Sequence, residues 1–174
     1  MVSAKTKNAI LFAAITLIWA LIDQVVKGII RVNLAIGQQI PIIPGFFSLW
    51  HVQNTGAGFS LFTGWNGLLI WISIAVIGFI IYQIDFITEK AFHAVDLGMV
   101  LGGALGNLID RIFFGAVTDF FDFFIIFDHF PAFNVADAGI TIGAITQIIV
   151  MVIEEWKLGK GNRDTKGSQQ PNRK

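Results

Sequence analysis

The chain has 174 residues, of which 55% are hydrophobic and 14% are charged, and its mean hydropathy is +0.70. Soluble domains carry roughly 25% charged residues, so this composition excludes an ordinary water-soluble domain and indicates that lipid is the solvent. The formal net charge is zero. The chain contains no cysteine, which excludes disulfides, thiolate metal sites and cysteine nucleophiles.

Four stretches are long and apolar enough to cross the hydrocarbon core of a membrane, which needs roughly 20 helical residues. They are residues 9–28, 65–84, 94–113 and 136–156. An even number of spans returns the chain to its starting side, and the basic residues near both termini favour the cytoplasmic side. We therefore expect an all-α integral membrane protein, with four transmembrane helices and both ends inside, in a single domain over 1–158.

The connection 32–64 contains no Lys or Arg, so we expect it on the outer side of the membrane. Within it, residues 40–62 are punctuated by prolines and contain an aromatic, β-prone run, and Asn54-Thr55-Gly56 is a turn signal. These features predict a small extracytoplasmic β platform over 40–62.

Two further segments differ from the apolar spans in composition. The segment 120–133 holds seven phenylalanines beside Asp122, Asp128 and His129, a mixture that suits the headgroup region, so we expect it to lie on the outer surface as an interfacial segment. The tail 159–174 is polar and basic, which predicts a disordered cytoplasmic tail.

Small residues recur at helical spacing in the last two predicted spans. Gly98, Gly102 and Gly106 are four residues apart, and Gly139 and Gly143 repeat that spacing on the next span. Because small residues let helix backbones approach closely in lipid, we expect these glycines to pack the third and fourth spans together.

Carboxylates inside or beside apolar spans are costly, so each of them needs a partner or a role. Asp110 lies near the outer end of the third span, Asp119 falls in the short return that follows it, and Asp137 begins the fourth span. The topology therefore brings Asp119 and Asp137 to the same depth, at the outer boundary of the membrane.

Two aspartates brought together share a proton near neutral pH, because mutual repulsion raises the proton affinity of one of them. One carboxyl group then acts as a base that activates a water, and the other as an acid that hydrogen-bonds a scissile carbonyl. This chemistry requires neither a metal nor a cofactor. His51, His93 and His129 are scattered over both sides of the predicted topology without ligand spacing, so we expect them to be surface residues rather than metal ligands.

The spacing leaves alternatives open for the same acids. In one, Asp119 caps a turn and Asp137 caps the fourth helix. In another, Asp122 faces the same way as Asp119 within a helical turn and takes its place. Two other classes of function also remain open: a carrier or channel whose intramembrane acids bind a cation or relay protons, and a non-catalytic scaffold that docks partners on its phenylalanine-rich segment.

Five motifs, in order from the first span to the fourth, resemble those of lipoprotein signal peptidase, also called signal peptidase II. They are Asp23-Gln24-Val25-Val26-Lys27, Asn54-Thr55-Gly56-Ala57-Gly58-Phe59-Ser60, Gly102-Gly103-Ala104-Leu105-Gly106-Asn107-Leu108-Ile109-Asp110-Arg111, Val117-Thr118-Asp119-Phe120 and Phe133-Asn134-Val135-Ala136-Asp137. The resemblance implies an endopeptidase of four helices and a small outer β platform. It would cut the signal peptide from diacylglyceryl-modified prolipoproteins, just before the lipidated cysteine, at the outer face of the bacterial cytoplasmic membrane.

The resemblance also implies that Asp119 and Asp137 are the catalytic pair, and it leaves Asp122 as a solvated or interfacial charge. Asp23 and Lys27 are four residues apart on one helix face, which favours an ion pair at the outer end of the first span. The family nevertheless places both near its active site.

The remaining motif residues are candidates for substrate binding or for support of the aspartates. Asn107, Asp110 and Arg111 lie within one helical turn. From there Asn107 and Arg111 can offer hydrogen-bond donors to substrate carbonyls, and Asp110 can hold the guanidinium of Arg111 in place. Asn54 and Asn134 are typical of turns, but the resemblance favours functional roles for them.

Gly56 and Ala136 belong to the same motifs and complete the set of candidate site residues. The implied partners are lipid-modified prolipoproteins and membrane lipid, with no nucleic acid. Nothing in the sequence demands more than a monomer.

Overall fold

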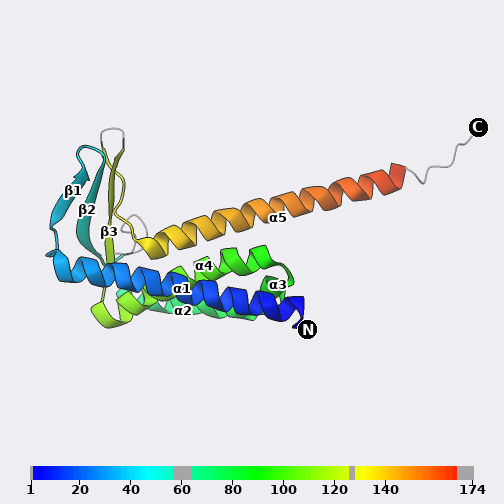
Figure 1. Ribbon diagram of the computed structural model, residues 1–174, viewed down its shortest axis with the longest axis horizontal. Coiled ribbons are helices and arrows are strands. Elements are labelled where there is room, and N and C mark those ends of the chain that lie inside the picture. Colours follow the sequence, from blue (N-terminus) through cyan, green and yellow to red (C-terminus); the bar gives the residue numbers. More distant parts are fainter. Residues whose placement is uncertain (1, 57–63, 126–127, 168–174) are drawn as a thin grey trace, which may run out of the picture.

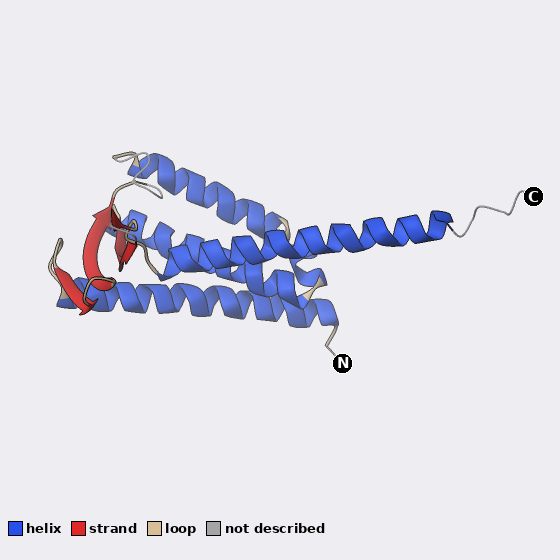
Figure 2. Cartoon of the chain, turned by 90° about the horizontal axis from the view of Figure 1, so that it is seen from above, coloured by secondary structure: helices blue, strands red, loops and turns tan. Residues whose placement is uncertain are grey.

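The computed structural model describes residues 2–56, 64–125 and 128–167, and it combines long helices with one small sheet (Figures 1 and 2). The elements in chain order are α1 (Ala4–Asn33), β1 (Gln39–Ile43), β2 (Phe47–Asn54), α2 (Asn66–Tyr82), α3 (Ile84–Glu89), α4 (Ala91–Phe114), β3 (Val117–Ile125), β4 (Asp128–His129) and α5 (Val135–Gly167). The sheet lies at the end of the helix bundle where α1 ends and α5 begins, and the N-terminus lies at the opposite end (Figure 1).

Within the described residues, three helices are long and apolar enough to cross a membrane by length and composition. They are Ala4–Asn33, Ala91–Phe114 and the Val135–Lys157 part of α5. They correspond to the first, third and fourth predicted spans. Helix α2 is also apolar, but its 17 residues give a length of about 25 Å, less than the roughly 30 Å hydrocarbon core. The second predicted span therefore stays a prediction.

Helix α4 packs against both α1 and α5, and glycines on different faces of α4 make each contact possible. A Cβ added at Gly98 would lie 3.1 Å from Ile15, and one added at Gly102 would lie 2.7 Å from the carbonyl oxygen of Thr16, both on α1. A Cβ added at Gly103 would instead meet the carbonyl oxygen of Ala136 on α5. These glycines therefore let the three backbones approach closely.

The glycines were predicted to pack the third and fourth spans together. This is confirmed for Gly143, which faces Asp96 on α4, but wrong for Gly139, which faces Trp19 on α1, and for the repeat on α4. Gly98, Gly102 and Gly106 were expected to face the fourth span, but all three face α1, where the Asp23 carboxylate occupies the space beside Gly106. Residues four apart share one helix face, and the next residue points about 100° away from it. The contact with α5 is consequently made by Gly103, which lies outside the repeat.

The sheet has the order β1-β2-β3-β4, with antiparallel pairing throughout. Strands β1 and β2 form a hairpin whose turn contains Gly45 in the left-handed region (φ 74°), a conformation that glycine adopts without the cost a Cβ imposes. They lie within the predicted β platform to within a residue, while residues 57–63 of that prediction are outside the described residues. Strand β3 was not predicted.

The segment 120–133 was predicted to lie on the outer surface of the membrane as an interfacial segment. Its place relative to a membrane stays a prediction, but its first residues belong to a strand that the sequence did not predict. Strand β3 pairs with β2 in the register Phe47↔Phe123 and Asn54↔Val117. Phe120 has 0% exposure and Asp122 has 2%. The backbone of Phe120 bonds to Phe133 and the Asp122 carboxylate accepts from Gln39, while on the other face of β3 the Phe123 ring stacks on Phe47 at 4.7 Å between ring centroids. Residues 120–125 are therefore part of the sheet.

Helix α5 continues to Gly167 and projects well beyond the rest of the bundle (Figure 1). The first part of the predicted disordered tail, 159–167, is therefore helical in the structure. Once a helix has formed, each added residue gains a hydrogen bond without a new nucleation cost. Residues 168–174 lie outside the described residues.

The close packing of α4 and α5 predicts a stability difference between two glycine substitutions. A Cβ at Gly143 would meet the carbonyl oxygen of Asp96 on α4, whereas a Cβ at Gly78 on α2 would meet nothing within 4 Å. Gly143→Ala should lower the free energy of unfolding by about 1–3 kcal/mol through overpacking. Gly78→Ala should leave it unchanged or raise it slightly, because alanine favours helix.

The measurement is thermal unfolding of both variants in the same detergent, beside the unsubstituted chain. Equal melting temperatures for the two variants would show that α5 does not pack on α4 through Gly143.

Candidate active site

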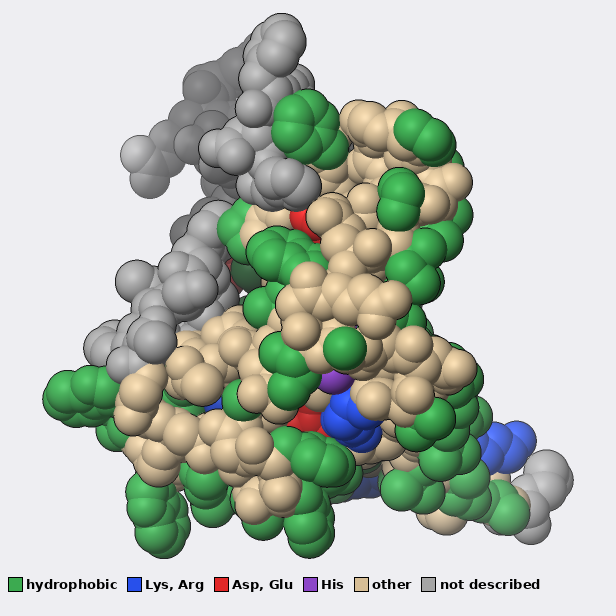
Figure 3. All heavy atoms as spheres, turned by 90° about the vertical axis from the view of Figure 1, so that its left-hand side faces the viewer, with side chains coloured by type: hydrophobic (Ala, Val, Ile, Leu, Met, Phe, Trp, Pro, Cys, Tyr) green, Lys and Arg blue, Asp and Glu red, His purple; other side chains and the backbone are tan. Residues whose placement is uncertain are grey.

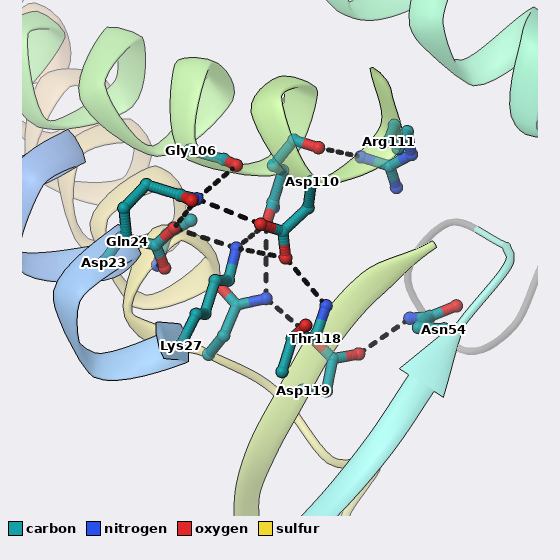
Figure 4. A network of polar contacts seen from close by, with 12 residues as sticks. Asp23, Gln24, Lys27, Asn54, Gly106, Asp110, Arg111, Thr118 and Asp119 are labelled. Carbon is teal, nitrogen blue, oxygen red and sulfur yellow. Dashed lines mark hydrogen bonds and ion pairs between the residues drawn. The ribbon is translucent and has the colours of Figure 1, made fainter. Parts of the chain in front are cut away.

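Polar side chains from the helix bundle and the sheet converge where β2 and β3 meet the ends of α1 and α4 and the start of α5 (Figure 4). Viewed from the sheet end, acidic, basic and histidine side chains reach the surface side by side, and hydrophobic side chains project around the edges (Figure 3). Two groups of contacts make up the site: a buried ionic network on the bundle side, and a pair of aspartates that line a cavity.

The ionic network surrounds Lys27, whose side chain has 0% exposure. Its ammonium lies 2.8 Å from the carboxylate of Asp23 and 3.4 Å from that of Asp110, and it donates to Asn107 Oδ1 at 2.9 Å. Both carboxylates are also fully buried. A charge removed from water needs several partners of this kind. The predicted ion pair of Asp23 and Lys27 therefore lies inside the protein, as part of a larger cluster.

The two carboxylates of this network also hold the chain on either side of the aspartate pair. Asp23 Oδ1 accepts the backbone N–H of Ala136 at 2.8 Å, in the first turn of α5. Asp110 Oδ2 accepts the backbone N–H of Thr118 at 2.9 Å, at the start of β3. The network thus fixes the backbone next to both Asp137 and Asp119.

Asparagine side chains hold the aspartate pair and link its members. Asp119 accepts from Asn54 Nδ2 at 2.9 Å and from Asn134 Nδ2 at 2.6 Å. Asp137 accepts from Asn107 Nδ2 at 2.8 Å. Because Asn134 Nδ2 also donates to Asn107 Oδ1 at 3.2 Å, a chain of hydrogen bonds runs from one aspartate to the other through two amides.

The local sequence explains the position of Asp137. Asn134 caps α5: its Oδ1 accepts the backbone N–H of Asp137 at 2.9 Å, and Asp137 Oδ2 accepts the backbone N–H of Asn134 at 3.2 Å. This reciprocal arrangement is a capping box. The helix cap is therefore Asn134 rather than Asp137, and the carboxylate of Asp137 is fixed at the positive end of the helix dipole.

Asp119 differs from Asp137 in its surroundings, because it lies on β3 with only 2% exposure. Burial raises the pKa of Asp119 to about 7, and the neighbouring charge of Asp137 adds to this rise. The amides of Asn54 and Asn134 and the charge of Lys27 oppose it. A carboxyl group with this pKa exchanges its proton near neutral pH, as the predicted acid of a pair requires.

Both aspartates line one cavity of about 760 Å³. Its walls are mostly apolar and come largely from β2, the start of β3, the segment before α5 and the first turns of α5. The lining residues are Trp50, Val52, Gln53, Asn54, Thr55, Arg111, Val117, Asp119, Phe130, Pro131, Ala132, Phe133, Asp137, Ala138, Ile140, Thr141 and Ile142. Arg111 donates to the carbonyl oxygen of Gly56 at 3.1 Å, and its Nε finds no partner among the described residues.

All the residues proposed from the sequence lie at this site. Asn54, Arg111, Asp119 and Asp137 line the cavity. The others lie behind it or act through the backbone, namely Asp23, Lys27, Asn107, Asp110, Asn134, Gly56 and Ala136. Their catalytic and supporting roles stay predictions.

The structure separates Asp122 from the pair. Residues three apart on a strand point to opposite faces, and Asp122 accepts from Gln39 Nε2 at 2.7 Å on β1 instead of lining the cavity. Asp122 was predicted to be a solvated or interfacial charge; a solvated charge is wrong, because its side chain is 2% exposed, and the interfacial position stays a prediction. The prediction of surface histidines was also wrong for His51 and His93, which are 4% and 1% exposed; the side chain of His129 is outside the described residues.

Sequence reasoning missed three residues that complete the network. Gln24 Nε2 donates to Asp110 Oδ1 at 3.0 Å, and Arg31 donates to the same oxygen at 3.2 Å and to Thr118 Oγ1 at 3.1 Å. Asp23, Lys27 and Arg31 are spaced by four residues, so this regular helical spacing was the available signal for Arg31. No sequence pattern marked Thr118 as a partner of Arg31.

The apolar helices and the small sheet with its polar site define a multi-pass membrane protein. Comparison with known proteins identifies it further. The model of the family described as signal peptidase (SPase) II matches residues 15–153. The chain belongs to the signal peptidase II family.

Individual relatives agree with this assignment. A lipoprotein signal peptidase of Maridesulfovibrio salexigens is 40% identical over 78% of this chain and 90% of its own length. One of Ralstonia nicotianae is 42% identical over 76% of this chain and 78% of its own length. A solved bacterial membrane enzyme superposes with a TM-score of 0.73 at 30% identity and covers 94% of both chains.

The buried network predicts a large effect of removing Lys27. Lys27→Met should destabilise the protein by about 3–5 kcal/mol, because it leaves two buried carboxylates without their ammonium partner. The matched control is Lys5→Met on the same helix, since Lys5 and its partner Asp85 are 59% and 86% exposed and exposed pairs contribute little. Chemical unfolding in detergent measures both, and equal stabilities of the two variants would contradict the network.

The raised pKa of Asp119 predicts a pH dependence of stability. The pKa of the Asp119 carboxyl group is about 7 in the folded protein and about 4 in the unfolded chain. Its contribution to stability is therefore fully present below about pH 4. As the pH rises to about 7, the unfolded chain releases its proton first and this contribution is lost. The Asp119→Asn variant is neutral at every pH and should lack this loss. Melting temperatures of the two proteins between pH 4 and 8 should therefore diverge in favour of the variant.

The cause of that pKa is tested by Asp137→Asn. Removing the negative charge of Asp137 should lower the pKa of Asp119, measured by ¹³C NMR of the labelled carboxyl group, while burial keeps it above the ordinary value. If the Asp119 carboxyl group titrates near 4 in the unsubstituted chain, neither burial nor the charge of Asp137 raises its pKa.

Proposed function

We propose that this chain is an endopeptidase that removes the signal peptide from diacylglyceryl-modified prolipoproteins, cutting just before the lipidated cysteine. Its family membership supports the proposal, as do relatives named lipoprotein signal peptidase. The observation that carries the mechanism is that Asp119 and Asp137, from two separate elements, line one cavity and are joined through Asn134 and Asn107.

The surroundings of the two aspartates suggest which of them is the acid. The pKa of Asp119 is raised to about 7, so Asp119 carries the shared proton. Asp137 accepts two N–H donors at the N-terminus of α5, where negative charge is favoured, so we assign Asp137 the role of the base.

Hydrolysis then follows as general acid and base catalysis. Asp137 takes a proton from a water held between the carboxyl groups while the water oxygen bonds to the scissile carbonyl carbon. Asp119 gives its proton to the carbonyl oxygen, and a tetrahedral diol forms. When the C–N bond breaks, the amine nitrogen takes the proton from Asp137, and Asp119 recovers its proton from a hydroxyl group of the diol.

The cavity suits a peptide attached to lipid. Its walls are mostly apolar, and Asn54 and Arg111 offer polar groups beside the aspartates. Arg111, with an Nε free of partners among the described residues, is a donor for a substrate carbonyl. The substrate enters laterally between helices, so its acyl chains stay in the bilayer throughout.

The topology we propose has four spans, with α2 as the second, and both termini in the cytoplasm. The sheet would then stand at the outer face of the bacterial cytoplasmic membrane. Two facts support this orientation: basic residues lie near both termini, and the connection that carries β1 and β2 has none between 32 and 64. The protein acts as a monomer in this scheme.

The experiment is a cleavage assay with purified protein in lipid, given one prolipoprotein with and without its diacylglyceryl group. Only the lipidated form should be cut, because its acyl chains hold it at the membrane site. Asp119→Asn and Asp137→Asn should each reduce turnover by more than about a thousandfold, since the two carboxyl groups act as a unit, while both variants stay folded.

Asp122→Asn is the matched control, because Asp122 is a buried acid of the same strand that does not line the cavity. It should keep near-normal turnover. Normal turnover by either Asp119→Asn or Asp137→Asn would remove that residue from the mechanism. Cation or proton flux in liposomes without cleavage would instead favour a carrier.

A further inference from the structure

Arg31 lies in the last turn of α1, and its contacts reach two other elements. Its side chain is 20% exposed, and the guanidinium carbon lies 4.2 Å from the centroid of the Phe114 ring at the end of α4. Its Nη1 donates both to Asp110 Oδ1 at 3.2 Å and to Thr118 Oγ1 at 3.1 Å. A guanidinium held on a ring face and by two acceptors has little freedom to move.

Thr118 is held from two sides as a result. Its hydroxyl group accepts from Arg31, while its backbone N–H donates to Asp110 Oδ2 at 2.9 Å. Thr118 is 3% exposed, so water does not compete for these bonds. In the described sheet, Thr118 pairs with Gln53 of β2, near the start of β3 and the end of β2.

Asp119 follows Thr118 directly, so its Cα lies about 3.8 Å from the point that is held. Arg31 bonds to Asp110 and Thr118, so it reaches Asp119 through Thr118. Arg31 and Thr118 also lie outside the cavity lining, unlike Val117 and Asp119.

We propose that Arg31, acting through the Thr118 hydroxyl group, is a positioning residue that sets the placement of Asp119 for hydrolysis. The inference rests on the proposed function, because it assigns Arg31 a part in that reaction. Catalysis is sensitive to such placement, since a displacement of about 1 Å at a reacting group can cost about a hundredfold in rate.

The test uses variants of the full chain in the lipidated prolipoprotein assay. Thr118→Val removes the hydroxyl group while it keeps the shape and the backbone N–H that Asp110 holds. Arg31→Met removes the guanidinium, and Arg31→Lys restores a charge and a donor. Lys5→Met, which removes an exposed cation at the far end of α1, is the matched control.

We expect Thr118→Val to lower kcat by about tenfold, with KM and melting temperature nearly unchanged. Arg31→Met should lower kcat at least as much, and Arg31→Lys should recover part of the loss. The double variant Arg31→Met, Thr118→Val should be no slower than Arg31→Met alone, because both changes remove the same bond. Lys5→Met should match the unsubstituted chain.

Three results would overturn the inference. In the first, Thr118→Val and Arg31→Met each keep a kcat within twofold of the unsubstituted chain. In the second, the fold-loss of kcat in the double variant equals the product of the two single fold-losses. In the third, kcat falls only as far as the melting temperature falls, and Arg31→Lys recovers none of it.

A second measurement separates this inference from the proposed function. The ¹³C signal of the labelled Asp119 carboxyl group should shift in Thr118→Val and Arg31→Met but not in Lys5→Met. If the unsubstituted chain cuts no prolipoprotein, the proposed function fails. If the carboxyl signal of Asp119 is identical in all variants, the positioning role of Arg31 fails, whatever the chain cuts.

Discussion

The burial of one ammonium group, that of Lys27, constrains the rest of this structure. Transferring a charge from water into a protein costs several kcal/mol even after relaxation, so Lys27 must be surrounded by acceptors. Asp23, Asp110 and Asn107 meet that requirement. Each of these partners then uses its remaining atoms to hold another element: Asp23 holds the start of α5, Asp110 the start of β3, and Asn107 the carboxylate of Asp137. Compensation of the charge and positioning of the site are thus achieved by the same contacts.

Such contacts require helix backbones that lie very close together, and glycine makes this possible. The Asp23 carboxylate occupies the space that a side chain at Gly106 would fill, and the carbonyl oxygen of Ala136 occupies the space beside Gly103. In lipid, no hydrophobic force drives helices together, so close packing and polar contacts must do so. The glycines are therefore a precondition for the ionic network and not merely a packing motif.

The site also treats its two aspartates differently. Asp137 stands in the first turn of a capped helix, while Asp119 is buried on a strand. A helix N-terminus favours negative charge, and burial disfavours it. The two carboxyl groups of one cavity therefore have different surroundings, which is the condition that the proposed acid and base roles require.

The sequence by itself determined the properties that depend on local composition and spacing. Apolar runs predicted the long helices, the turn residues predicted β1 and β2, and the motifs predicted the membership in the signal peptidase II family and the acids at the ends of spans. These signals are local, because hydropathy and turn chemistry act over a few neighbouring residues.

Tertiary structure alone decided which faces and which distant segments meet. The pairing of Phe47 with Phe123 makes the first part of the expected interfacial segment a strand, and that strand directs Asp119 into the cavity and Asp122 away from it. The contact of Arg31 with Thr118 likewise joins residues far apart in the chain. The physical reason is that strand pairing and helix facing depend on long-range register: a shift of one residue reverses the direction of a side chain in a strand and turns it by about 100° in a helix.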